Sequence, residues 1–315
     1  MSISVKLYWP SKPEEYNYKY FQNQLCRHLF IDKKQDKIVS MGSCCAREMK
    51  DVFLRKGYRY LEGENNKNPW INLGWGDGGR GKTDHSSVAW ERVYNTFAIK
   101  QIFQYSFEGV DFDRFYRFNF GGEEYISDLL RTRIVYRDID NAKKDLEDHI
   151  IESKRVLTQL DVFVLTLGMA EIFESKKRGI VLGFDSKNIP LENTFKFRMS
   201  EYEENLDNLI YIYNLLKKHN PCAKIIVMVS PMHILGTYRD DIDIYSASCL
   251  TKSILVACAN RFVRICEDAY YFPSYEIATI LMPLINKNPY VDGHHISDNV
   301  LMDIFSTFEH MYLKI

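Results

Sequence analysis

The sequence has little of what marks membrane-spanning, secreted or repetitive proteins. It contains no run of 18 apolar residues, so we expect no membrane-spanning helix. The first residues, MSISVKLYWP, lack a basic cluster followed by an apolar run, so we expect no secretory signal. Internal repeats and low-complexity tracts are absent from the printed sequence. These absences favour a globular protein without a membrane-spanning helix.

Cysteine usage also lacks a regular pattern. The seven cysteines are odd in number and unevenly spaced, which argues against a disulfide framework and favours a reducing, cytoplasmic location. The adjacent pairs Cys44–Cys45 and His294–His295 lack the spacing that brings ligands onto one metal ion. We therefore expect no metal site and no cofactor.

Charge of one sign is not in excess. The chain has 41 basic and 42 acidic residues, a formal net charge of -1, which argues against nucleic acid as a partner. Aromatic residues make up 14% of the chain. They fit carbohydrate or aromatic ligands, but core packing is the better-supported interpretation. With 315 residues, the chain can bury a large core as one domain.

Short apolar runs alternate with longer amphipathic segments. Strands are predicted at 38–41, 162–167, 225–230 and 269–272. Helices are predicted at about 44–56, 141–159, 200–219, 245–266 and 297–312. A capping box of Ser200 and Glu203 marks the start of the third of these helices. This alternation predicts an α/β fold, a three-layer α/β/α sandwich with a mainly parallel central sheet.

Three segments do not follow the alternation. Residues 1–36 are interpreted as an N-terminal extension packed on the core, and residues 37–315 as a single domain. The glycine- and tryptophan-rich segment at about 62–87 is predicted to be a loop insertion that contributes to selectivity. Residues 174–199 are predicted to form a loop or hairpin excursion.

Two separate patterns point to nucleophilic catalysis. Ser43 follows the first strand and precedes a helix, a position at the carboxyl edge of a parallel sheet where α/β folds bind ligands. A helix N-cap is the competing interpretation of Ser43. Asp292 and His295 lie three residues apart before the last helix, a spacing that lets a carboxylate reach an imidazole. A serine nucleophile needs such a pair to accept and orient its proton.

Several blocks in order along the chain resemble the GSCFA-domain family, a bacterial branch of the SGNH/GDSL hydrolase superfamily. They are GSCCA at 42–46, YNTFAI at 94–99, TLGMAE at 166–171, VSP at 229–231, YYFPSYEI at 270–277, and the final D-x-x-H-x-S at 292–297. The resemblance implies an SGNH-hydrolase-like fold. It also implies Ser43 as nucleophile, His295 as general base and Asp292 as the residue that orients it.

The resemblance further implies that the Ser43 amide donates to an oxyanion. In the wider superfamily a G-x-N-D block supplies a second donor, its asparagine, but Ala170 stands at that place here. Asn95 is the candidate replacement, with a helix N-cap as the equally weighted alternative. Gly168 either allows close backbone approach at the site or ends its strand, and Cys44 is interpreted as packing.

Three functions remain open from the sequence. The first is hydrolysis of carboxylic acyl esters, with acyl groups on a glycan or another small alcohol as substrates. The second is O-acyl transfer through the same triad in surface polysaccharide biosynthesis, with acyl-coenzyme A as a donor. The third is a non-catalytic binding protein on this fold.

Overall fold

The computed structural model describes residues 7–64, 86–91, 93–183 and 195–314. Most of the predicted loop insertion at 62–87 therefore lies outside the described residues. Within the described ranges, none of the helices is long and apolar enough to cross a membrane.

A parallel sheet forms the centre of the fold. It consists of β1 (Ile38–Gly42), β5 (Val162–Leu167), β9 (Lys224–Val229) and β10 (Ala269–Phe272), in the order β1-β5-β9-β10. Every neighbouring pair is parallel, and the register is continuous from Ile38 opposite Val162 to Gly42 opposite Thr166. The four predicted strands and their parallel pairing are confirmed. Their nearly uninterrupted apolar runs fit a sheet that is covered on both faces.

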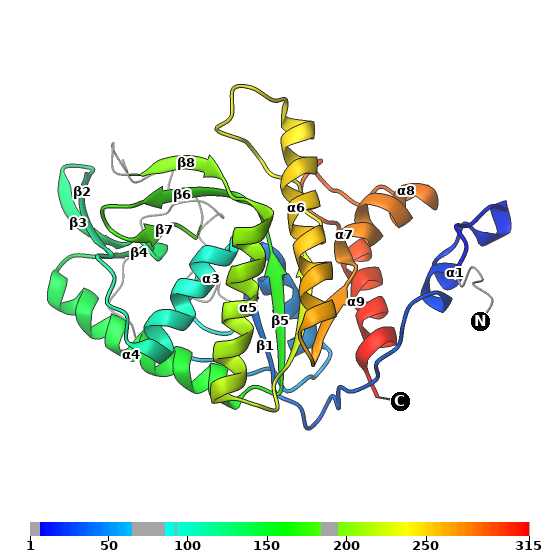
Figure 1. The fold of residues 1–315 in the computed structure, drawn as a ribbon, viewed down its shortest axis with the longest axis horizontal. Coiled ribbons are helices and arrows are strands. Elements are labelled where there is room, and N and C mark those ends of the chain that lie inside the picture. Colours follow the sequence, from blue (N-terminus) through cyan, green and yellow to red (C-terminus); the bar gives the residue numbers. More distant parts are fainter. Residues whose placement is uncertain (1–6, 65–85, 92, 184–194, 315) are drawn as a thin grey trace.

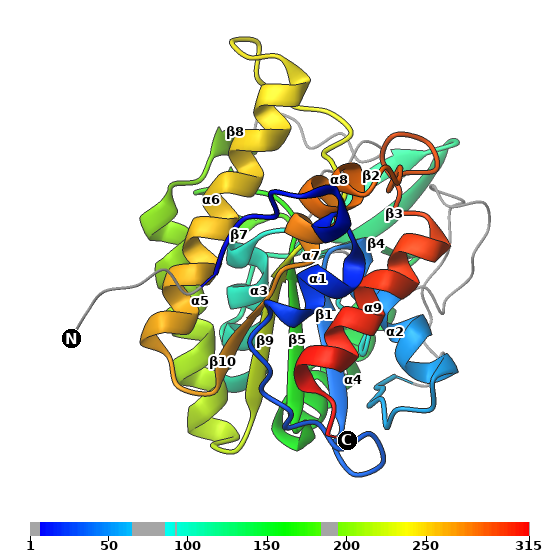
Figure 2. The same ribbon diagram turned by 90° about the vertical axis from the view of Figure 1, so that its right-hand side faces the viewer.

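Alternate residues of each strand enter two different cores. Along β5, Phe163 and Leu165 pack on one face, while Val162 and Val164 pack on the other. The first face is covered by α3 (Thr96–Phe103), α4 (Ile139–Gln159), α5 (Tyr202–His219) and α6 (Ile244–Ile265). The second is covered by α2 (Cys44–Arg55) and α9 (Asp298–Tyr312). In Figure 2 the sheet stands between α5 and α6 on the left and α2 and α9 on the right, which gives the predicted three layers.

The N-termini of most of the longer helices are capped by a side chain that accepts a hydrogen bond from a backbone amide of the first turn. Asp138 caps α4, and Asp243 caps α6. The capping box of α5 is formed by Glu201 and Glu204, so the predicted box was wrong by one residue. The reason is tertiary, because the Ser200 hydroxyl donates instead to the Ala170 carbonyl, 2.6 Å away.

Two small antiparallel sheets extend the fold at one end (Figure 1). One contains β2 (Phe115–Phe120), β3 (Glu123–Asp128) and β4 (Arg131–Tyr136), and the sequence analysis did not find it. The other has the order β7-β6-β8, with β6 (Glu171–Ser175), β7 (Ile180–Val181) and β8 (Lys196–Met199). In this second sheet β7, β8 and the end of β6 fall in the segment 174–199 that was predicted as a loop or hairpin excursion, and β6 begins three residues before it.

The remaining elements are short. The segment before β1 contacts the last helix, since the His28 amide donates to the Met311 carbonyl (2.7 Å) and Ile31 pairs with Leu313. The other elements are η1 (Pro13–Glu15), α1 (Tyr18–Asn23), η2 (Gln104–Glu108), α7 (Ser274–Glu276), η4 (Ile277–Leu281) and α8 (Met282–Leu284).

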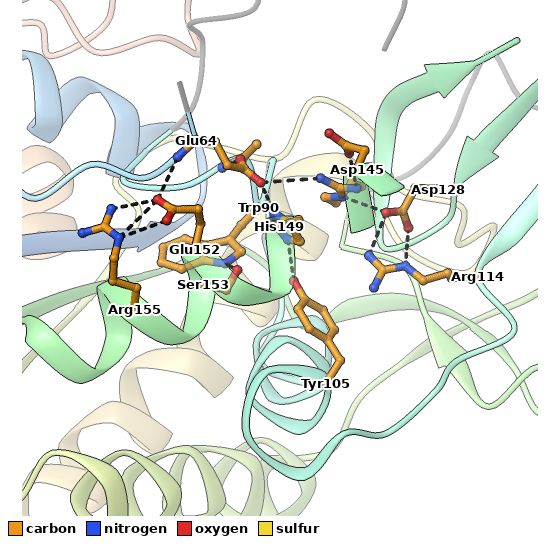
Figure 3. A network of polar contacts seen from close by, with 12 residues as sticks. Glu64, Trp90, Tyr105, Arg114, Asp128, Asp145, His149, Glu152, Ser153 and Arg155 are labelled. Atoms are coloured by element: carbon orange, nitrogen blue, oxygen red, sulfur yellow. Dashed lines mark hydrogen bonds and ion pairs between the residues drawn. The ribbon is translucent and has the colours of Figure 1, made fainter. Parts of the chain in front are cut away.

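A buried cluster of charged residues attaches the β2-β3-β4 sheet to α4. Asp128 forms ion pairs with Arg114 (Figure 3) and with Arg131. Arg131 also pairs with Asp145 on α4, with 2.8 Å between Nη2 and Oδ2. His149, also on α4, pairs with Glu64 and with the Tyr105 hydroxyl. We call the following residues the charge network: Glu64, Arg114, Asp128, Arg131, Asp145 and His149.

Candidate active site

The junction between β1 and α2 is shaped by a glycine. Gly42 has φ +133°, and a Cβ atom there would lie 2.0 Å from the Thr166 carbonyl oxygen of β5. Only glycine tolerates both this backbone conformation and this approach. The chain therefore leaves the sheet tightly against β5, and α2 begins at once with Cys44.

Ser43 is held by β5 at this junction. Its amide donates to the Thr166 carbonyl (3.1 Å), and its Oγ lies 3.2 Å from Thr166 Oγ1. The residue is only 2% exposed, and among the described residues it shares no hydrogen bond with His295. The pairing of Ser43 with His295 therefore stays a prediction, and the Ser43 amide, the expected oxyanion donor, already has an acceptor in Thr166.

A cavity of about 820 Å³ lies at the carboxyl edge of the sheet. That is within the size range of small-molecule sites. Its walls come from α2, from the turns after β5 and β9, from α6, and from the segment before α9. Among the predicted site residues, Asn95, Gly168 and His295 line it, whereas Ser43 does not. Cys44, which the sequence analysis interpreted as packing, also lines it.

Asp292 and His295 come together at the rim of the cavity. Asp292 Oδ2 lies 2.7 Å from His295 Nδ1, and Asp292 Oδ1 accepts hydrogen bonds from the amides of His294 and His295. The bond from the His295 ring, together with these amide bonds, holds the pKa of the Asp292 carboxyl well below its usual range. An ionised Asp292 fixes the Nδ1–H tautomer of His295 and leaves Nε2 to accept a proton.

His294 also lines the cavity, but it does not take the place of His295. Only the His294 amide reaches Asp292, and the buried His294 Nδ1 has no partner among the described residues. Burial and the neighbouring His295 lower the pKa of His294 to about 4. Its ring is therefore neutral at neutral pH.

Lys252 is a site residue that sequence reasoning missed. It lies in the middle of α6, is 2% exposed, lines the cavity, and donates to the Gly168 carbonyl at 2.6 Å. Burial lowers the pKa of Lys252 to about 8, while the nearby Cys44 and Cys45 act in the opposite direction. No local pattern marks this lysine, because its role depends on α6 packing against the end of β5.

Gly168 and Asn95 both line the cavity. A Cβ atom on Gly168 would lie 2.5 Å from Tyr94 Cδ1, so this glycine does permit close approach. Asn95 caps α3, its Oδ1 accepting from the Ala98 amide (2.9 Å), and its Nδ2 donates to the Leu182 carbonyl (2.7 Å). The cap is confirmed. The amide group has a second hydrogen, for which the described residues show no acceptor, so the oxyanion role stays a prediction.

Comparison with known proteins decides the family. Residues 37–308 match the GSCFA family. The chain belongs to the GSCFA family. No curated protein matches this GSCFA chain.

Two solved structures are similar to this GSCFA chain. One is a carbohydrate esterase family 3 protein from Talaromyces cellulolyticus, with 9% identity, 87% of this chain and 94% of that chain covered, and a TM-score of 0.33. The other is a carbohydrate esterase family 2 enzyme plus carbohydrate binding domain from Corynascus thermopiles (Myceliophthora fergusii), with 16% identity and a TM-score of 0.22. There the match covers 36% of this chain and 27% of that chain, so this chain spans about a quarter of its length.

The part of this GSCFA chain that the structure describes holds no group of three or more histidine, cysteine or acidic side chains arranged for a metal ion. Glu48, one helical turn after Cys44, is an acidic residue of the cavity wall. Its Oε2 is buried without a partner among the described residues. Burial raises the pKa of Glu48 to about 7, opposed by the positive charge of Arg47 and His295.

Glu48 is expected to make stability fall as pH rises from about 4.5 to 7. A carboxyl whose pKa is higher in the folded than in the unfolded protein binds more protons when folded, so its stabilising effect is lost through this window. The melting temperature of wild type should therefore decrease more between pH 5 and pH 7.5 than that of Glu48→Gln. His294 titrates in the opposite sense, but it is common to both proteins and cancels in the difference. Parallel curves for the two proteins would contradict the prediction.

Proposed function

We propose that this GSCFA protein hydrolyses carboxylic acyl esters by the chemistry of SGNH/GDSL hydrolases. The observation that carries the proposal is the Asp292–His295 pair, bonded at 2.7 Å at the rim of a cavity of about 820 Å³. The N-terminus of α2 opens on the same cavity and favours negative charge there. Catalysis of acyl transfer requires a proton acceptor, a group that stabilises negative charge and space for a substrate, and this cavity has all three.

In the proposed reaction His295 removes the proton of a nucleophile as that nucleophile attacks the ester carbonyl. It then gives the proton to the departing alcohol, and Asp292 holds the ring and stabilises its positive charge. Water then attacks the acyl-enzyme in the same way, with His295 acting again first as base and then as acid. Two adjacent residues at the junction carry nucleophilic atoms, Ser43 and Cys44, and this reaction class holds with either.

An acyl group on a glycan is the proposed substrate class. Aromatic residues line the cavity, among them Phe173, Phe197 and Tyr238, whose rings contact one another. Tyr238 stands perpendicular to Phe173 with 4.7 Å between ring centroids, and its side chain is 55% exposed. Rigid aromatic surfaces of this kind offer large contact area at little entropic cost. A sugar ring whose ester points toward His295 packs against them.

A panel of p-nitrophenyl acyl esters and acyl-coenzyme A thioesters, each with and without a glycan acceptor, tests the proposal. Wild type should release p-nitrophenol, and His295→Ala should not. Release that depends on the acceptor, with acyl transfer to it, would show an acyltransferase. Absence of turnover on every ester and thioester, together with glycan binding, would contradict the proposal in favour of a binding protein.

Asn95→Ala is expected to lower kcat for ester hydrolysis by about 100- to 1000-fold, the usual effect of losing one oxyanion donor. The free Asn95 N–H would face the negative oxygen of the tetrahedral intermediate, while its Oδ1 caps α3. Asn95→Asp is the matched control, because aspartate keeps the cap acceptor but has no N–H to donate. Both variants should lose activity. Asn95→Ala should also lose about 1 kcal/mol of stability through the cap, and Asn95→Asp should lose stability as well, because a carboxylate oxygen would then face the Leu182 carbonyl that now accepts from Asn95 Nδ2. Full activity in Asn95→Asp would show that Asn95 is only a cap.

A further inference from the structure

Two nucleophilic atoms lie side by side at the β1–α2 junction, but in different surroundings. Ser43 is the N-cap residue, 2% exposed, with both its amide and its hydroxyl against Thr166. Cys44 is the first residue of α2, 9% exposed, and lines the cavity. The backbone turn set by Gly42 therefore directs Ser43 into the sheet and Cys44 into the cavity.

Two groups near Cys44 stabilise negative charge. It lies at the N-terminus of a 12-residue helix, where the partial positive charge of the helix favours an anion. The buried ammonium group of Lys252 lines the same cavity, and its electrostatic interaction with Cys44 contributes to the Lys252 pKa. On another side, Cys44 Sγ lies 3.1 Å from the thioether of Met232, which limits the positions the thiol can take.

The proton-transfer groups face the same space as Cys44. His295, His294 and Glu48 all line the cavity with it, and His295 already has its Nδ1 on Asp292. The unpartnered His294 Nδ1 and Glu48 Oε2 leave this wall with unused hydrogen-bonding capacity among the described residues, as expected for a site that takes a polar ligand. Cys44 is thus part of a cluster, not an isolated thiol.

We infer that Cys44, not Ser43, is the nucleophile of the proposed reaction, and this inference rests on the proposed function. His295 takes the thiol proton, and Cys44 Sγ adds to the ester carbonyl carbon. The C–O bond to the alcohol breaks, the alcohol leaves with the proton from His295, and a thioester remains on Cys44. His295 then takes a proton from water, the hydroxide adds to the thioester carbonyl, and the C–S bond breaks. The acid is released and the thiol is restored, so the step needs no oxidant, reductant or further reactant.

Cys45 supplies a matched control within the same turn of helix. It is 1% exposed and does not line the cavity, and burial raises the pKa of its thiol well above its usual value. A cysteine so placed is chemically inert. Cys45→Ala should therefore leave turnover close to that of wild type, and any loss of stability is measured separately by its melting temperature.

The first experiment locates the acyl group. Wild type is quenched during turnover of p-nitrophenyl acetate and cleaved with trypsin, which releases residues 38–47 as one peptide holding Ser43, Cys44 and Cys45. The expected product is acetyl-Cys44, removed by neutral hydroxylamine as thioesters are.

Cys44→Ala should lower kcat by at least about 10⁴-fold, and Ser43→Ala should stay within about tenfold of wild type. Cys44→Ser keeps the size of the side chain and should also lose most activity, which covers the case that Cys44→Ala fails to fold. A hydroxylamine-resistant acetyl group on Ser43, with an active Cys44→Ser, would overturn the inference and leave the proposed function intact.

The second experiment does not depend on turnover. Wild type is treated with limiting iodoacetamide at neutral pH, and the alkylated cysteines are identified by peptide mapping. Cys44 should react faster than Cys26, Cys222 and Cys249, although these three are exposed and it is not. If the ester and thioester panel shows no turnover, the proposed function fails, and this rate order alone decides whether Cys44 is an activated nucleophile. Slower reaction of Cys44 than of the three exposed thiols would overturn the inference whatever the panel shows.

Discussion

Asp292→Asn is expected to lower kcat for ester hydrolysis by about 10⁴-fold, as in other hydrolases whose orienting carboxylate becomes an amide. Asparagine keeps an oxygen for the amides of His294 and His295, so the turn that carries the pair should persist. Its NH2 group, however, replaces the oxygen that now lies 2.7 Å from His295 Nδ1. An N–H donor at that place requires Nδ1 to be the acceptor. The ring proton then sits on Nε2, which can no longer accept one from the nucleophile.

Asp298→Asn is the control for this prediction. Asp298 lines the same cavity and begins α9, so the substitution removes the same charge without touching the His295 ring. It should change kcat by less than about tenfold, whereas both variants should melt near the wild-type temperature because surface changes rarely exceed about 0.5 kcal/mol. Equal losses in the two variants would mean that Asp292 acts only through charge, and full activity in Asp292→Asn would remove it from the mechanism.

The central sheet could be predicted because its signal is local and repeated. The four parallel strands are short runs of apolar residues buried on both faces, and their order in the chain with intervening helices leaves little choice of architecture. The contact of Asp292 with His295 could be predicted for the same reason, since both residues lie on one turn. Predicting this contact required no knowledge of residues that are distant in the chain.

Which residue of the β1–α2 junction faces the cavity could not be predicted from the sequence. Ser43 and Cys44 are consecutive, and which of them faces the cavity depends on the φ of Gly42 and on its approach to Thr166. Composition and spacing contain neither quantity. Lys252 was missed because it reaches the site through helix packing across 84 residues of sequence, to the Gly168 carbonyl.

The β2-β3-β4 sheet was missed because its buried face carries charge. Asp128 is fully buried and Arg131 is 1% exposed, yet in the sequence both have the character of surface or turn residues. A strand that buries charged residues breaks the alternation of apolar and polar positions on which strand prediction depends. Asp128 and Arg131, which made the strands hard to predict, form the ion pairs that attach this sheet to α4.

Asp128 is therefore expected to be one of the most sensitive positions for stability. Its carboxylate accepts from Arg114 Nε and Nη2 (2.8 and 2.7 Å), from Arg131 Nε (2.7 Å), and from the Leu130 amide (3.0 Å). The two guanidinium groups hold the pKa of the Asp128 carboxyl well below its usual range, against the effect of burial. The carboxylate thus stays charged in the folded protein, and its contribution is lost only as acid protonates it.

Asp128→Ala should lower the free energy of unfolding by about 3–5 kcal/mol, because it leaves buried positive charge without its partner. The matched control is Glu124→Ala on the same strand. Glu124 pairs with Arg117 at the same N–O distance, 2.7 Å, but both side chains are 58% exposed. Water screens that pair, so its loss should cost no more than about 1 kcal/mol. Urea unfolding of both variants and wild type measures the difference directly.

Activity separates this structural role from a catalytic one. None of the charge network residues lines the cavity, so the folded fraction of Asp128→Ala should keep the KM and kcat of wild type for the preferred ester. Asp128→Asn offers a milder change, because it keeps the shape but places an NH2 group against arginine donors, and it should fall between Asp128→Ala and wild type in stability. If Asp128→Ala unfolds no more easily than Glu124→Ala, the burial of these ion pairs contributes nothing to stability. The β2-β3-β4 sheet must then be attached to α4 by the apolar packing of Ile126, Ile134 and Ala142.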